Sequence, residues 1–347
     1  MFQKKLGFGK FFLGDFVEKY KPGDSVIDFN KLGPLWQPAI INTQRVNSNL
    51  INIGNLYETI KTKRNKLHSK NNFFKLLMVL GVFVGIGGFI LIKHILPIIV
   101  GVLFFMPYVG LRSFLSNISK DIIKVQIAEE NNWLYDPEKD YSSWSQLRHN
   151  YKEIFNKGDE SQCLEDQFWG SVKKDNKDYY FNTGLFHYTT VSRDSKGRTQ
   201  RHPHIEHFIG VRLNKKINSR FYLYPENVFS KIGNFFTKKE INTQSIEFNK
   251  TFAFSYNGKK SEQGMEIVQT LSPAVQQKLI QLKKENGSVR ILFCDDSVFF
   301  NFNGTMMNSY ETDLLKDSNI SEKDKALFNK KINTLIDISS DISKYLD

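Results

Sequence analysis

One long apolar block constrains this chain more than any other feature of its sequence. From Phe73 to Leu111 the charged residues are Lys75, near the start, and Lys93, in the middle, where His94 follows. The part from Phe73 to Ile92 has 20 residues. With about 1.5 Å of rise per residue, such a helix spans roughly 30 Å, the thickness of a bilayer's hydrocarbon core. The part from Ile95 to Leu111 has 17 residues, at the short end of the spanning range.

The Lys93-His94 pair decides between one interrupted span, two spans, and a buried core helix. A lysine at the centre of the bilayer costs at least about 2.5 kcal/mol. At the far interface the same lysine can extend its charged end into water at little cost. We therefore predict two spans joined by a tight turn at Lys93-His94. Pro97 then falls in the first turn of the second helix, where its missing N–H does no harm.

Three glycines before the turn predict a helix-packing face. Gly81 and Gly85 have the GxxxG spacing, and Gly88 lies one turn further along nearly the same face. Small residues at this spacing allow two helices to approach closely. The partner is either the second helix of the hairpin or a helix of another subunit. The alternative is that glycine is simply common in membrane helices.

The charge distribution predicts the orientation of the hairpin. Residues 1–72 carry 12 Lys/Arg against 5 Asp/Glu, whereas residues 113–347 carry 33 against 31. The run KTKRNKLHSK, which precedes the first span, favours the cytoplasmic side. With two spans both termini are then cytoplasmic, in a multi-pass protein. The nearly neutral soluble part argues against nucleic-acid binding. Cys163 and Cys294 are far apart, which argues against a disulfide framework or a zinc ribbon.

The sequence after the membrane block predicts an α+β fold, a two-helix transmembrane hairpin followed by a cytoplasmic domain with an antiparallel sheet and flanking helices. We expect a basic N-terminal segment at 1–72, the hairpin at 73–112, a helical stalk and linker at 113–177, the α+β domain at 178–310, and an amphipathic helix at 311–347. That last helix can cap the domain or pair with a partner helix.

Local patterns place the elements of that domain. Residues 178–213 alternate with period two on both sides of a DSKG turn, which predicts a hairpin of two long strands. Residues 246–256 also alternate and are expected to form a strand. Ser272 and Pro273 begin a helix that Asn286-Gly287 ends. Two short strands are expected around a turn at Asp295-Asp296-Ser297. Aspartates are common in turns, so a turn is a simpler interpretation of Asp295 and Asp296 than a paired-carboxylate site.

The C-terminal part resembles a known group of proteins. The run from Phe248 to Gly304 contains Phe248, Phe252, Leu271-Ser272-Pro273, a leucine-rich helix and a hairpin around Phe293, and Phe168-Trp169-Gly170 enters the strands. In this phrase, and in the two closely spaced spans before it, the chain resembles an uncharacterised bacterial membrane-protein family, a domain of unknown function. The resemblance covers residues 113–310 at the level of pattern. It implies a domain on a hairpin in the bacterial cytoplasmic membrane, often encoded near LemA-type proteins, and no known activity or catalytic residue.

The histidines are the one constellation that suggests metal chemistry. If the DSKG turn sets the register directly, His187 lies opposite His204, and His202 lies two residues away on the same face. Imidazoles within about 7–8 Å of one another could share a zinc ion. A slip of one residue would scatter them, and a plain polar sheet face is the simpler alternative.

The function we expect is a membrane-anchored, non-enzymatic scaffold or protein-binding module without a cofactor. No GxSxG, HExxH or Cys–His pattern occurs in the sequence. The expected partners are membrane lipids and another membrane or cytoplasmic protein, such as a LemA-type protein, or a second copy of the chain. Two alternatives remain open, a sensory domain that binds a lipid or small molecule, and a metal-dependent enzyme that uses His187, His202 and His204.

Overall fold

The computed structural model describes residues 71–92, 98–102, 123–128, 133–137, 139–225, 243–256, 267–304 and 322–346, with scattered positions between 62 and 131. These residues fall into two compact units. The first holds the described residues up to 130 together with 322–327, and the second holds 131–304 and 328–346. Lys93 and His94, the expected turn of the hairpin, lie outside the described residues, and so does Pro97, expected in the first turn of the second helix.

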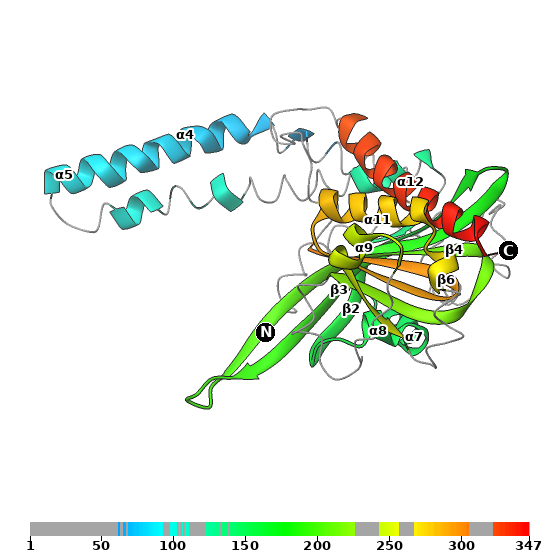
Figure 1. Ribbon diagram of the computed structural model, residues 1–347. Coiled ribbons are helices and arrows are strands. Elements are labelled where there is room, and N and C mark those ends of the chain that lie inside the picture. The colour runs from blue at the N-terminus through cyan, green and yellow to red at the C-terminus, as the bar shows by residue number, and fades with distance from the viewer. Residues whose placement is uncertain are drawn as a thin grey trace. The chain divides into compact units, whose positions relative to one another are not determined.

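The first unit contains an unbroken helical stretch. It consists of α4 (Asn71–Val82), the π-helical turn η4 (Phe83–Gly87) and α5 (Gly88–Ile92) (Figure 1). Within it, Asn72–Leu91 is one helix of 20 residues, long and apolar enough to cross a membrane, with a mean hydropathy of 2.3. It is the one such helix in the described part of the chain. Residues 98–102 and 108–110 are also helical.

The second unit is built on a six-stranded antiparallel sheet, counted over the described residues. Its strands run in the order β1-β2-β3-β4-β5, and β6 pairs with β4 beside that path. The strands are β1 (Leu134–Asp136), β2 (Glu160–Lys174), β3 (Lys177–Arg193), β4 (Thr199–Pro225), β5 (Phe252–Tyr256) and β6 (Val289–Asn303). The 27 residues of β4 give it room to pair with β3, β6 and β5 along its length.

Helices cover both faces of this sheet, which confirms the α+β expectation. They are α7 (Tyr141–Asn150), α8 (Lys152–Phe155), α9 (Ile246–Thr251), α11 (Pro273–Asn286) and α12 (Glu322–Lys344). In Figure 1, α11 and α12 lie on one side of the sheet and α7 and α8 on the other. On the α8 side, the ring of Phe155 packs edge-on against Phe186 and Phe208. On the other side, Tyr179 of β3 donates to Ser340 of α12.

The helix boundaries follow from their capping residues. Ser272 accepts a hydrogen bond from the backbone N–H of Val275, and Pro273 occupies the first turn of α11, as expected. Gly287 then ends the helix with φ of +75°, a conformation that favours glycine. Asp140 caps α7 by accepting from the N–H groups of Ser142 and Ser143.

Glycine at position 170 is required by the packing of a tryptophan. A Cβ added to Gly170 would lie 2.4 Å from Cδ1 of Trp133, well inside van der Waals contact. The Trp133 indole rests on strand β2 at this point and donates from Nε1 to the carbonyl of Ser171. The Phe168-Trp169-Gly170 run therefore marks a close contact inside the sheet, rather than the entrance to it.

The expected boundary at residue 178 was wrong. Residues 134–177, assigned to a stalk and linker, supply β1, α7, α8 and β2, with Trp169 fully buried. The sequence pattern of β2 was hard to recognise because Ser161 and Asp166 adopt positive φ and interrupt the alternation of the strand. The many polar residues of this region obscured the pattern further.

Two smaller expectations were also wrong. Residues 246–251 form helix α9, begun by Ser245, and the strand starts at Phe252. The region around Asp295 is not a turn between two strands, since β6 continues through it with a bulge. By contrast, α12 does cap its own domain. Its buried residues include Ile332, Leu335, Ile338 and Ile342.

Candidate functional site

The exposed large apolar side chains gather in the first unit. Among the described residues, 22 large apolar side chains are exposed, and 17 of these lie between Phe73 and Val109. Phe83 is 71% exposed and Leu91 84%. In the second unit the exposed ones are scattered singly, as is normal for a protein in water: Tyr141, Ile205, Ile246, Val268 and Tyr345.

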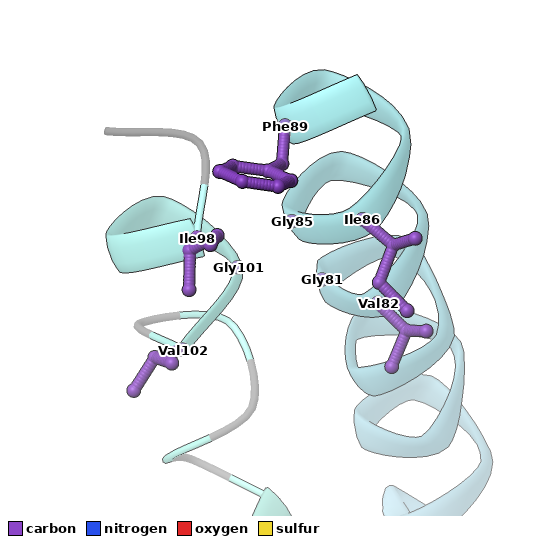
Figure 2. Close-up of a pocket in the computed structure, with 8 residues that line it drawn as sticks. All are labelled: Gly81, Val82, Gly85, Ile86, Phe89, Ile98, Gly101 and Val102. Carbon is purple, nitrogen blue, oxygen red and sulfur yellow. The ribbon is translucent and has the colours of Figure 1, made fainter. Parts of the chain in front are cut away.

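The glycine face of the helix is occupied within the chain. A Cβ added to Gly101 would lie 2.5 Å from the carbonyl oxygen of Gly81 and 2.9 Å from Cα of Gly85, so the two backbones are in direct contact. Gly81, Gly85 and Gly101 are all buried, and Gly88 is half-buried. Figure 2 shows the segment that carries Gly101 beside the helix that carries Gly81 and Gly85. Residues 98–102 of the same chain therefore contact this glycine face.

An apolar groove runs along this contact. Its volume is about 320 Å³. Its lining is Gly81, Val82, Gly85, Ile86, Phe89, Ile98, Gly101 and Val102 (Figure 2). No polar side chain lines it, so it offers shape and apolar contact but no chemistry.

The expected pairing of the histidines was wrong by one residue. His204 pairs with Tyr188 rather than with His187, which instead pairs with Ile205. Adjacent residues of a strand point to opposite faces, so His187 lies on the face opposite His202 and His204. Its Nε2 lies 2.8 Å from the carboxylate of Glu165.

The two remaining histidines bond to neighbouring hydroxyls. Nε2 of His204 lies 2.8 Å from Oγ1 of Thr190, and Nε2 of His202 lies 3.1 Å from Oγ of Ser192. In the part of the chain that the structure describes, no group of three or more His, Cys, Asp or Glu side chains is placed to hold a metal ion. The expected His187–His202–His204 cluster is therefore not formed.

A cluster of charges around Glu206 lies where β3, β4 and β6 meet, and sequence reasoning missed it. Nζ of Lys157 lies 2.6 Å from one carboxylate oxygen of Glu206. The other oxygen accepts from Arg290 at 2.7 Å and from the Tyr188 hydroxyl at 2.8 Å. Arg290 also donates to the side chain of Asn303. Three segments far apart in the sequence are thus tied to one carboxylate.

The electrostatics of this cluster are set by burial. Burial by itself would raise the pKa of Glu206, but the charges of Lys157 and Arg290 outweigh it and lower that pKa to about 2. Burial also lowers the pKa of Lys157 to about 8, even beside the carboxylate. Glu206 is therefore ionised at neutral pH and balances two cations. With three donors on its carboxylate, it is a structural anchor rather than a general base.

The two aspartates at 295 and 296 sit on the bulge of β6. Asp295 has φ of +48° and an exposed side chain. Asp296 accepts from Nε of Arg212 at 3.0 Å on the neighbouring strand. The two carboxylates therefore lie in different environments and do not form a paired acid–base site.

Both cysteines are buried, which argues against a nucleophilic role. Cys163 is 3% exposed and Cys294 is fully buried. Burial raises the pKa of both thiols, that of Cys163 to about 11. Neither is therefore a reactive thiolate at neutral pH.

Comparison of the chain with family models, with curated proteins and with solved structures finds no match.

Proposed function

We propose that this chain is a membrane-anchored, non-enzymatic protein. In this proposal a two-span helical hairpin holds the α+β domain at the cytoplasmic face of a bacterial membrane, with both termini on that side. There the domain binds another protein. The protein would thus act by presenting a folded domain close to a membrane.

One observation carries the anchoring, the exposure of the apolar helix Asn72–Leu91. Only 6% of the apolar stretch of this helix is buried, whereas the core helix of a soluble protein is mostly buried. Leaving 17 large apolar side chains in water would be costly, at about 25 cal/mol for each Å² of apolar surface. A bilayer removes that cost and satisfies the helix backbone internally.

The contact of Gly101 supports a second span. Ile98, Gly101 and Val102 line one groove with Gly81 and Gly85, so the two apolar segments lie side by side. Ile99, Phe104, Met106 and Val109 are exposed, as lipid-facing residues of a second membrane helix would be. The turn between the spans would then fall at Lys93-His94, with the lysine at the far interface.

Reporter fusions test the topology of this hairpin. A reporter joined after residue 72 and one joined after residue 113 should both report the cytoplasm, because two spans return the chain to its starting side. A fusion after His94 serves as the matched control and should report the opposite side. Fusions at 72 and 113 on opposite sides of the membrane would mean a single span and would overturn the proposed hairpin.

Protein binding is tested with the chain in its own membrane. Chemical cross-linking in intact membranes, followed by purification, should recover a partner in constant ratio. The resemblance described above suggests a LemA-type protein as the first candidate, and a second copy of this chain as another. Recovery of an uncross-linked monomer alone would count against the protein-binding part of the proposal.

A further inference from the structure

The hairpin of β3 and β4 extends beyond the rest of the sheet. On one side, β2 accompanies β3 up to the pair Glu160–Thr189. On the other side, β6 accompanies β4 only from the pair His207–Phe302 onward. Beyond these points, residues 190–202 form strand pairs only with each other and make a two-stranded projection, which Asp159 and Glu160 contact near its base through Val191 and Arg201. We call residues 190–202 the arm; it ends in the green loop at the tip of the hairpin in Figure 1.

The tip of the arm is strongly basic. Arg193, Lys196 and Arg198 are all exposed, and within the described residues none of them forms an ion pair. The acidic residue among them, Asp194, accepts from the backbone N–H groups of Lys196 at 2.9 Å and Arg198 at 2.8 Å. The carboxylate of Asp194 is thus engaged by the backbone of the turn, and three cations within six residues remain available to bind an anionic partner.

The backbone of the arm is well defined by its own hydrogen bonds. The N–H of Asp194 donates to the carbonyl of Arg198, and the N–H of Gly197 donates to the carbonyl of Asp194. Gly197 has φ of +75°, as hairpin turns of this kind require. At the base, the ring of His204 stacks on Tyr188 with centroids 4.8 Å apart. Tyr188 in turn donates to the buried Glu206. The charges are therefore presented on a preorganised support.

The composition of the arm favours a charged surface over a protein as its partner. Protein interfaces have an apolar core with aromatic anchors. The arm has no Phe, Tyr or Trp, and its largest apolar side chain, Val191, is half-buried. Nucleic-acid binding would call for a basic face on the domain as a whole, yet residues 113–347 are almost neutral. A cluster of cations without an apolar anchor fits anionic lipid headgroups, where each Lys or Arg gains about fivefold in binding.

We propose that the arm binds anionic phospholipid headgroups of the membrane that anchors the chain. This inference rests on the proposed membrane anchoring. Twenty residues separate Gly110 from Asn131, and a chain of that length reaches at most about 70 Å in any conformation. The tether keeps the local concentration of lipid surface around the arm high, so that three cations suffice for docking.

The experiment uses the full chain in vesicles and measures the distance of the arm tip from the lipid surface. A donor fluorophore on Ser195→Cys reports the tip, because the native Cys163 and Cys294 are buried and do not compete for a maleimide label. The acceptor is a headgroup-labelled lipid. Energy transfer should be greater in vesicles of phosphatidylserine and phosphatidylcholine than in phosphatidylcholine alone, and added salt should abolish the difference.

Charge variants identify the residues responsible. The triple variant Arg193→Gln, Lys196→Gln, Arg198→Gln should lower the docking equilibrium by roughly a hundredfold. The matched control, Lys173→Gln, Lys177→Gln, Lys250→Gln, removes the same charge from exposed positions outside the arm and should leave transfer unchanged.

Three outcomes would overturn the inference. The first two are equal transfer in both lipid mixtures and an equal loss in the control variant. The third is a response to an acidic polypeptide or RNA with none to lipid. Failure of the chain to float with vesicles of either composition would instead contradict the membrane anchoring itself.

Discussion

At the scale of single residues, the most consequential side chain of the sheet domain is Glu206. It is the one carboxylate in a cluster with two cations, and it is 3% exposed. Removing one member of a buried ion cluster leaves the others uncompensated, which costs more than the cluster contributes when it is complete. Glu206 contacts both Lys157 and Arg290, so its removal should destabilise the domain more than the removal of either cation.

We expect Glu206→Gln to lower the free energy of unfolding of the domain by about 3 kcal/mol or more, because Lys157 and Arg290 lose their common counter-charge. Lys157→Met should cost only about 1 kcal/mol. Burial already disfavours the charged form of Lys157, and Glu206 keeps Arg290. Denaturant unfolding followed by the fluorescence of the buried tryptophans measures both. Equal losses in the two variants would contradict this account.

The low pKa of Glu206 also predicts how the stability of the domain depends on pH. Because the pKa of Glu206 is about 2 in the folded state, below its value of about 4.5 in the unfolded chain, its stabilisation is complete above pH 4.5 and is lost as the pH falls toward 2. The amount at stake is on the order of 3 kcal/mol. The stability gap between the native chain and Glu206→Gln should narrow across that window.

The histidines show the limit of sequence reasoning at this scale. The alternation of residues 178–213 was enough to place the two strands and their turn. The turn in fact leaves five residues, 194–198, between the last pair Arg193–Thr199, and this shifts every partner by one. The alternation of apolar and polar residues does not reveal how many residues the turn contains, so it cannot fix the register. Lys157 and Arg290, likewise, are brought to Glu206 by tertiary contacts that no local pattern encodes.

At the scale of elements, the contact between the two apolar segments depends on the absence of a side chain at Gly101. Gly101→Ala places a methyl group 2.5 Å from a carbonyl oxygen, so the segments must separate. We expect a clear fall in the melting temperature of the full chain in detergent. Gly87→Ala, in η4 of the facing helix, is the control, because a Cβ there meets nothing within 4 Å. Similar shifts in the two variants would exclude the glycine contact as their cause.

Elements with local signals were predictable, and those without were not. Helix α11 carries its own cap, proline and terminal glycine, and α12 its own apolar stripe, so both follow from sequence alone. Strand β2 could not be recognised in the same way. Its ladder with β3 shifts register twice, at Asp166 and near Ser161, and its burial depends on β1 and α7, which come earlier in the chain.

At the scale of the whole molecule, the separation of apolar and polar surface predicts how the chain partitions. Replacing Phe83, Ile86, Phe89, Ile90 and Leu91 with Gln should release the chain from membranes. The near-ultraviolet circular dichroism of the buried Trp133 and Trp169 should survive, because the sheet domain has its own core. Membrane flotation and circular dichroism measure the two effects.

The scattered apolar residues provide the control. Tyr141→Gln, Ile246→Gln and Tyr345→Gln change equally exposed side chains in the sheet domain and should leave the chain with the membrane fraction. If these substitutions released the chain as well, its attachment would depend on the domain surface rather than on the apolar helix.

Strand β4 gives the arm a mechanical property. From the arm tip it continues along β6 to its final pairs with β5, and its ladder with β6 shifts register between Arg212 and Ile217 and again before Phe221. Sliding it by one residue would turn Phe208 and Phe221 out of the core. The arm therefore cannot retract by sliding along the sheet. A force that pulled along the arm would be opposed by the strand pairs of β4 with β3 and with β6 together, so the domain core holds the arm at a fixed length.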